Sequence, residues 1–344
     1  LFYSFAPTDM ETNYRISPFV ELGRRLARQL AGGELDAVVA RAIAENGWFT
    51  RQSVAQAIEA ICTDLLDETV LRDWLARYPR PDASAVRRVG IVLAGNIPLV
   101  GFFDLLCVCI CGHRCFVKPS SKDRVLTGYV VEQLLRIEPA MPVAPLEEDT
   151  PLDALIATGS DSTRSYFGKR YREMPSLLRG SRYSIAVLDG TETEAQLEGL
   201  SNDVFQYFGL GCRNVGRIFV PRGYDPTLLR DALSRYPMSH PGYLNNYRQA
   251  RALRMLGGEP LLDGGFFLLR ESDEQSPNLS EIGYAYYDDL DGMESWIRRH
   301  DDRLQCVVSE VVDHPRRVGF GRAQHPSPTD YPDGTDVIAF LRRI

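Results

Sequence analysis

Cys212 is the residue best placed to do chemistry, because it lies on a glycine-rich turn in the stretch FGLGCRNVGRIFV, residues 208–220. Gly209 and Gly211 allow backbone angles closed to other residues and let a substrate approach the main chain. The N–H groups of Cys212 and Arg213 can then point at charge that develops on a carbonyl oxygen. An apolar strand follows. The pattern is typical of a presented nucleophile, and its alternative is a buried cysteine at a strand entry.

A second segment, residues 91–123, predicts one βαβ unit. It begins with a buried strand and a turn that carries Asn96, and continues with a wholly apolar helix. A short strand at 114–117 and a polar loop opened by Lys118 complete it. Taken alone, Asn96 is better explained as a plain turn residue.

A third segment, residues 152–167, predicts a strand that runs through Thr158, Gly159 and Ser160 into a helix. An amide-rich helix N-terminus beyond the carboxyl end of a strand is a ready phosphate site. Strand–Gly–Ser–helix turns are also common packing devices, so this segment alone leaves both interpretations open.

Taken together and in this order, the three segments resemble the aldehyde dehydrogenase superfamily. Within it they resemble the LuxC-type acyl-CoA reductases, which make long-chain aldehyde for bacterial luciferase. The resemblance covers about residues 85–341 and includes the motifs KPSSKD, YFGLGCRNV and GFGRAQHPSPTDYPDG. It implies an α/β, aldehyde dehydrogenase-like fold with a cofactor-binding and a catalytic domain. The chain has no GxGxxG motif, which fits a superfamily that binds its nicotinamide cofactor through other turns.

The resemblance assigns the chemistry to two residues. Cys212 matches the catalytic cysteine, which would attack a fatty acyl-CoA and form a covalent thioester. The side-chain amide of Asn96 and the backbone N–H of Cys212 match the donors of an oxyanion hole, where each donor contributes about 3 kcal/mol. The adjacent cation Arg213 is expected to favour the thiolate form of Cys212. Reduction of the thioester by the nicotinamide would release the aldehyde.

The same resemblance assigns a cofactor loop and predicts NADPH. Lys118 matches the lysine that contacts the adenosine ribose or its phosphate, and we expect Ser120, Ser121 and the turn 158–160 to contribute. Members that prefer NAD often carry a glutamate where this chain has Ser121, and Lys122 follows. A neutral hydroxyl beside two cations should accept a 2′-phosphate, which favours NADPH over NADH. The alternative is a solvated basic loop.

One absence indicates the fate of the thioester. Hydrolytic aldehyde dehydrogenases carry a Glu-Leu-Gly-Gly motif whose glutamate activates water, and the matching stretch here is SLLRGSRYS, with Leu177 or Leu178 at that place. Without that base, the acyl group should be reduced or exchanged with a thiol. Two other functions stay open, a cysteine-dependent acyltransferase or thioesterase without nicotinamide, and a non-catalytic acyl-binding scaffold subunit.

Three polar residues keep open roles. Glu271 or Glu274 lies near the place where the superfamily has a glutamate that holds the nicotinamide ribose, although the spacing is irregular. His240 belongs to a segment rich in polar aromatics that could line a substrate entrance, and a turn or helix-cap role is at least as well supported.

Composition limits the classes of partner. The chain has 344 residues, 44% of them hydrophobic, and a net charge of −7, which argues against nucleic acid or an anionic membrane as the main partner. The apolar run at residues 97–111 is interrupted and too short to span a bilayer, and no cleavable signal is visible. Seven cysteines without a secretory signal predict free thiols in the cytoplasm. We expect a homo-oligomer, in complex with acyl-transferring or acyl-activating enzymes.

Four clustered cysteines could suggest a metal site, but their spacing opposes it. Cys107 and Cys111 share one face of a helix, Cys109 points elsewhere, and Cys115 follows a glycine in the next strand. We interpret them as small apolar residues between a helix and a sheet, and expect no metal.

The chain is predicted to fold in three parts. Residues 1–82 form a helical N-terminal segment, and residues 83–190 form the α/β cofactor-binding domain, which residues 320–344 rejoin. The strand that ends near Gly190 closes this domain. Residues 191–319 form the catalytic domain.

Overall fold

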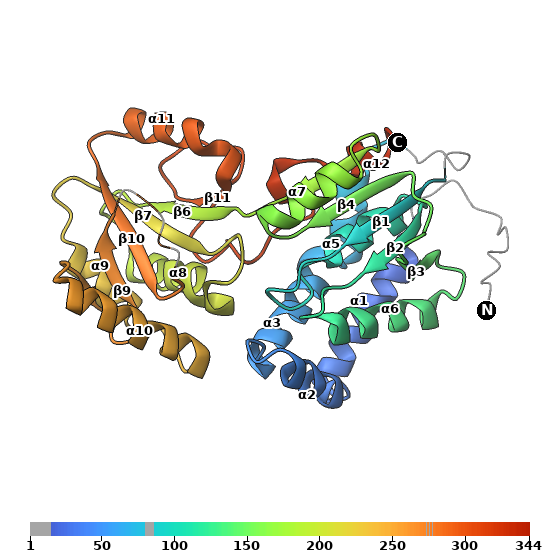
Figure 1. Ribbon diagram of the computed structural model, residues 1–344, viewed down its shortest axis with the longest axis horizontal. Coiled ribbons are helices and arrows are strands. Elements are labelled where there is room, and N and C mark those ends of the chain that lie inside the picture. The colour runs from blue at the N-terminus through green and yellow to red at the C-terminus, as the bar shows by residue number, and fades with distance from the viewer. Residues whose placement is uncertain (1–14, 80–85, 273, 275, 277) are drawn as a thin grey trace. The chain divides into compact units, whose positions relative to one another are not determined.

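The computed structural model describes residues 15–79, 86–272, 274, 276 and 278–344. The chain divides into two compact units (Figure 1). The first contains the chain up to Ser181 together with Ser327–Tyr331 and Thr335–Ile344. The second contains Arg182–Pro326 and Pro332–Gly334.

The first unit is built on a parallel sheet of five strands in the order β3-β2-β1-β4-β5. Its central strands are almost entirely apolar and buried, as expected for a parallel sheet. The chain moves from β1 outward through β2 to β3, then crosses back to β4 on the other side of β1. The strand order therefore reverses between β1 and β4, where ligands bind in open α/β sheets. The strands are β1 (Arg88–Val92), β2 (Arg114–Lys118), β3 (Val143–Pro145), β4 (Ala154–Thr158) and β5 (Ser176–Arg179).

Most of the predicted helical lead-in is helical, and it is part of the first unit. The helices α1 and α2 pack on α6, the helix that follows β2 (Figure 1). Their apolar faces join one hydrophobic cluster with the strands. Residues 1–14 and 80–85 lie outside the described part of the chain. The helices are α1 (Ser17–Ala31), α2 (Asp36–Glu45), α3 (Arg51–Ala60), a π-helical turn (Ile61–Leu65), α4 (Glu68–Leu75), α5 (Phe102–Ile110), α6 (Arg124–Ile137), α7 (Asp161–Arg170) and α12 (Val337–Leu341).

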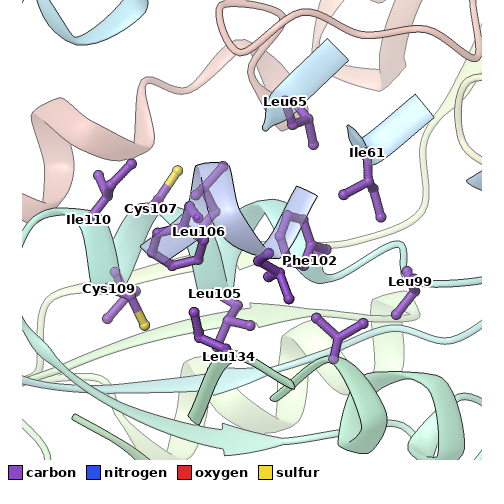
Figure 2. Packing of buried hydrophobic residues seen from close by; sticks show 14 of the residues in the cluster. Ile61, Leu65, Leu99, Phe102, Leu105, Leu106, Cys107, Cys109, Ile110 and Leu134 are labelled. Atoms are coloured by element: carbon purple, nitrogen blue, oxygen red, sulfur yellow. The ribbon is translucent and has the colours of Figure 1, made fainter. Parts of the chain in front are cut away.

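The helix α5 lies at the centre of this cluster (Figure 2). Nearly all of its residues are buried, and side chains from the π-helical turn and from α6 pack against it. Gly112 ends it with a φ of +82°, a conformation that glycine adopts without a steric penalty. Cys107, Cys109, Cys111 and Cys115 are all buried in this packing.

The second unit contains a sheet of seven strands in the order β12-β11-β6-β7-β10-β9-β8, parallel except for the β8–β9 pair. Cys212 lies three residues before the start of β7, in the turn that joins α8 to the sheet. The strands are β6 (Tyr183–Val187), β7 (Val215–Pro221), β8 (Leu262–Asp263), β9 (Leu268–Glu271), β10 (Glu281–Tyr287), β11 (Leu304–Val308) and β12 (Arg317–Val318). The helices are α8 (Glu194–Phe205), α9 (Pro226–Leu233), α10 (Pro241–Gly257) and α11 (Leu290–His300), with 3₁₀ turns at Gln206–Gly209 and Asp301–Arg303.

The predicted boundary at residue 190 is wrong. The strand β6, expected to close the first sheet, pairs instead with β7 and β11 of the second. The division therefore falls between Ser181 and Arg182. The C-terminal segment is divided as well, because residues up to Pro326 remain with the second unit, and most of the remainder belongs to the first.

No helix in the described residues combines the length and hydropathy needed to cross a lipid bilayer.

Candidate active site

Three loops of the first unit lie at one edge of its sheet. They follow β1, β2 and β4, which are neighbours and parallel, so their carboxyl ends share that edge. The first loop carries Asn96, the second Lys118, Ser120 and Ser121, and the third is the turn at residues 158–160. The residues predicted to bind the cofactor, and Asn96 with them, thus lie at the sheet edge where the strand order reverses.

The loops after β1 and β2 are in direct contact through Gly95. A Cβ atom at Gly95 would lie 2.6 Å from Cβ of Ser120 and 3.1 Å from Cβ of Asp123, closer than side chains approach. Glycine is therefore required here for close approach of the two loops rather than for a special φ angle.

Asp123, which the sequence analysis did not assign, links the same two loops. It precedes α6, where an aspartate commonly caps the helix, but its side chain makes no cap bond. Instead, its Oδ2 accepts a hydrogen bond of 2.8 Å from the backbone N–H of Leu99. The carboxyl is 2% exposed, and Oδ1 is buried with no hydrogen-bond partner. Burial raises the pKa of Asp123 to about 7.

The cofactor loop presents its cations to solvent. The side chains of Lys118, Ser121 and Lys122 are exposed. No carboxylate of the described residues forms an ion pair with either lysine. Ser120 is half-buried, and its Oγ accepts a hydrogen bond of 3.2 Å from the N–H of Lys122. Exposed ammonium groups on an ordered loop are the donors that an anionic dinucleotide requires, so these residues fit that class of cofactor.

The turn after β4 begins α7, and Ser160 caps this helix by accepting a hydrogen bond of 3.3 Å from the N–H of Thr163. A Cβ atom at Gly159 would lie 2.8 Å from Cγ2 of Thr163, which explains the glycine. The acidic residue in the first turn, Asp161, accepts a hydrogen bond of 2.9 Å from the N–H of Ser181.

A buried ion pair between Arg179 and Asp104 contacts the same turn through Thr158. Nη1 of Arg179 donates to both oxygens of Asp104, at 2.9 and 2.7 Å, and to Oγ1 of Thr158 at 3.2 Å. Asp104 lies on α5, so the pair joins α5, β4 and β5. Arg179 follows Leu177 and Leu178 on β5, and the resemblance predicts that one of these two leucines stands in place of the hydrolytic glutamate. Neither Arg179 nor Asp104 was predicted from the sequence as a site residue.

In the second unit, the backbone before Cys212 is strained. Tyr207, Phe208 and Gly209 have φ angles of 53°, 61° and 73°, and the first two conformations are unfavourable for residues with a Cβ atom. Leu99, three residues after Asn96, has a φ of 55°. Left-handed conformations of this kind cluster at functional sites, because the surrounding structure must compensate for their cost.

The buried side chain of Asn214 stabilises the Cys212 turn through hydrogen bonds to its backbone. Its Nδ2 donates to the carbonyl oxygens of Asp203 and Val204 at 3.2 Å and of Gln206 at 2.8 Å. Its Oδ1 accepts a hydrogen bond of 2.8 Å from the N–H of Gly211. An asparagine directly before an apolar strand is a sequence signal for such a turn, and it could have identified this residue.

The thiol of Cys212 is accessible, but its surroundings disfavour the thiolate form. Its side chain is exposed. Desolvation by the surrounding protein nevertheless raises the pKa of the Cys212 thiol to about 11, and Arg213 only partly opposes this effect. Arg213 lowers the pKa of Cys212, as expected, but desolvation outweighs this effect, so the net shift is upward. Beside the turn, Oγ of Ser184 donates to the carbonyl oxygen of Cys212 at 3.0 Å and lies 3.1 Å from Sγ of the buried Cys306.

The three residues whose roles the sequence left open have different surroundings. His240 is the N-cap of α10, and its Nδ1 accepts a hydrogen bond of 3.2 Å from the N–H of Tyr243. Its ring lies 4.3 Å from that of Phe208, in the strained turn. Glu271 and Glu274 are exposed at the end of β9 and beyond it. Across the described part of the chain, no group of three or more His, Cys, Asp or Glu side chains could hold a metal ion.

Comparisons with known proteins agree with this architecture. The chain is 24% identical over 235 residues to the long-chain acyl-protein thioester reductase of Aliivibrio fischeri, a match that covers 62% of this chain and 49% of that protein. The chain thus spans about half the length of this curated relative.

Solved structures show the same fold at low sequence identity. Aldehyde dehydrogenase 21 of Physcomitrella patens superposes with a TM-score of 0.68 at 12% identity, covering 96% of this chain and 85% of that one. An engineered glycolyl-CoA reductase with bound NADP+ superposes with a TM-score of 0.62 at 12% identity, covering 94% and 89%. The predicted aldehyde dehydrogenase-like α/β fold is confirmed.

The acyl-CoA reductase (LuxC) family is matched over residues 25–234, which is more than half of the chain and includes the Asn96 loop, the cofactor loop and the Cys212 turn. The chain therefore belongs to the acyl-CoA reductase (LuxC) family.

Proposed function

We propose that this protein reduces fatty acyl thioesters, such as acyl-CoA, to aldehydes with NADPH, through a covalent thioester on Cys212. The observation that carries the proposal is the Cys212 turn, where an exposed thiol follows a strained backbone in a chain of the LuxC family. The similarity to the long-chain acyl-protein thioester reductase of Aliivibrio fischeri supports the same class of substrate.

The proposed first step is acyl transfer to the protein. Sγ of Cys212 attacks the carbonyl carbon of the acyl thioester, and the bond to the leaving thiol breaks. Because the pKa of Cys212 is raised, its proton must leave during this step, and the departing thiolate is the group that accepts it. We assign the side-chain amide of Asn96 and the backbone N–H of Cys212 as donors to the carbonyl oxygen.

The proposed second step is reduction. NADPH, when bound, would supply the hydride that converts the thioester carbon to the aldehyde level and frees Cys212. The chain contributes Lys118, Lys122, Ser120, Ser121 and the turn at residues 158–160 to hold the dinucleotide. The glycolyl-CoA reductase solved with NADP+ supports this choice of cofactor class.

The place of the hydrolytic base supports reduction over hydrolysis. Leu177 and Leu178 on β5 have no proton-accepting group, and the next residue, Arg179, is a buried cation paired with Asp104. None of these three side chains can act as a base that activates water. An acyl group on Cys212 should therefore persist until hydride or another thiol removes it.

Mass spectrometry after incubation with a long-chain acyl-CoA tests the proposal. We expect one acyl group on the peptide that contains Cys212, followed by its loss and by oxidation of NADPH, measured at 340 nm, when the cofactor is added. Cys212→Ser should abolish both signals, whereas Cys306→Ser, a change at a buried cysteine of the same unit, should retain acylation. Acylation without oxidation of NADPH would favour the acyltransferase, and no acylation would favour the scaffold.

A further inference from the structure

A segment far along the chain lies against the Cys212 turn and the helix that precedes it. This segment, residues 320–323, comes more than one hundred residues after Cys212 in sequence and belongs to the same unit. It makes contact on both sides of the turn, through α8 on one side and Arg213 on the other.

The contact with α8 is made by Asp203, a buried carboxylate in the last turns of the helix. Its Oδ2 accepts a hydrogen bond of 2.7 Å from the N–H of Gly321, and its Oδ1 accepts one of 2.9 Å from the N–H of Ala323. Asp203 is 1% exposed, and both of its oxygens are used by the backbone of the segment. A bidentate carboxylate of this kind fixes the position of two peptide units at once.

Two glycines bring the segment into backbone contact with the same helix. A Cβ atom at Gly199 of α8 would lie 2.9 Å from the backbone nitrogen of Gly321 and 2.9 Å from the carbonyl carbon of Phe320. Gly321 itself has a φ of +77°, which glycine adopts most readily. No side chain at position 199 could be accommodated without moving the segment.

The second contact begins at the residue after the nucleophile. Nε of Arg213 donates a hydrogen bond to the carbonyl oxygen of Ala323. The backbone N–H of the same residue, Ala323, donates to Asp203. Asn214 then ties the turn back to the carbonyl oxygens of Asp203, Val204 and Gln206. The end of α8, the turn and residues 320–323 thus form one closed set of hydrogen bonds.

We infer that residues 320–323 hold the Cys212 turn in its reactive conformation, with Asp203 as the positioning residue. The inference rests on the proposed role of Cys212. Its physical basis is that the strained conformations of Tyr207 and Phe208 need support from contacts outside the turn, and this set of bonds supplies it.

Two variants test the inference. Gly199→Ala should displace the segment, and Asp203→Asn should break one of its two hydrogen bonds, because an amide has only one acceptor oxygen. Gly128→Ala on α6 is the matched control, since a Cβ atom there meets nothing within 4 Å. Two rates are measured at pH 8 by mass spectrometry, alkylation of Cys212 by iodoacetamide and its acylation by palmitoyl-CoA.

We expect the two rates to change in opposite directions in both variants. A loosened turn is better solvated, so alkylation of Cys212 should rise severalfold, while acylation should fall about tenfold because the attack geometry is lost. Buried Cys306 should stay unlabelled, which distinguishes this effect from unfolding of the unit. Gly128→Ala should match the wild type in both rates.

The inference is overturned if both variants keep both rates within twofold of the wild type, or if Cys306 is labelled together with Cys212 in both. A wild-type protein that is not acylated would contradict the proposed function instead. The alkylation rates would still decide whether residues 320–323 control the turn.

Discussion

At the scale of single residues, Lys122 is the side chain that we expect to distinguish the two nicotinamide cofactors. The resemblance predicts a glutamate in NAD-preferring members where the loop after β2 has Ser121, and the exposed side chains of Lys118 and Lys122 lie on either side of it in the sequence. Only NADPH carries the additional 2′-phosphate that a second cation can bind. The sequence predicted this loop, and the structure places it beside Asn96 at the same sheet edge.

We therefore predict that Lys122→Ala lowers the affinity for NADPH about tenfold and changes that for NADH less than twofold. Nicotinamide fluorescence titration measures both dissociation constants. Lys169→Ala, at an exposed lysine on α7 of the same unit, should leave both unchanged. Binding or turnover with NADH more than tenfold better than with NADPH would show that the assignment of the cofactor is wrong.

At the scale of elements, Asp123 connects the loops after β1 and β2. The hydrogen bond from Leu99 to Asp123 is made where the Asn96 loop has a left-handed residue, so it compensates for that conformation. Loss of the acceptor would leave a buried N–H without a partner, at a cost of about 1–3 kcal/mol.

Asp123→Ala is expected to loosen the Asn96 loop, whereas Asp123→Asn should preserve it, because the amide oxygen can still accept the hydrogen bond from Leu99. Hydrogen exchange of the peptide that covers residues 93–102 provides the measurement, and exchange should be faster only in the alanine variant. Thr127→Val is the control, since the contact between Oγ1 of Thr127 and the same carboxylate oxygen is long, at 3.5 Å, and therefore weak. Equal protection in all three variants would refute the link.

At the scale of the whole molecule, each unit contains a buried aspartate that titrates near neutrality. The pKa of Asp123 in the first unit is raised to about 7, and that of Asp203 in the second to about 6, in both cases chiefly by burial. The ordinary pKa of an aspartate is 3.8, so between pH 4 and 7 the folded protein binds more protons than the unfolded chain. Stability should therefore fall as pH rises through this window.

The expected decrease is on the order of a few kcal/mol for each unit and should be complete above pH 7. Urea unfolding, followed by tryptophan fluorescence from pH 4 to 8, measures it. Asp123→Asn and Asp203→Asn should each flatten the profile of their own unit. Asp153→Asn is the contrasting control, because a hydrogen bond from Arg88 lowers the pKa of Asp153 to about 2 and places its effect below pH 4. A stability that rises between pH 4 and 7 would contradict this assignment.

The sequence by itself determined the class of fold, the strand-end loops that carry the predicted site residues, and the glycine-rich turn at Cys212. Those features depend on local patterns: apolar runs predict buried strands, and Gly, Asn and Ser after a strand predict turns. The strand–turn–helix order around Asn96 and Thr158 was recognisable for this reason, and the motifs at Cys212 and KPSSKD carried the resemblance to the family.

Only the tertiary structure decided which elements belong together. The strand β6 has an apolar pattern that suits either parallel sheet, and its pairing with β7 and β11 is a long-range choice that the pattern does not encode. The same holds for Asp123 with Leu99, and for Asp203 with residues 320–323. A buried polar side chain needs a hydrogen-bond partner, and this can be expected from its residue type. Which distant backbone N–H becomes that partner depends on how the sheets and helices pack.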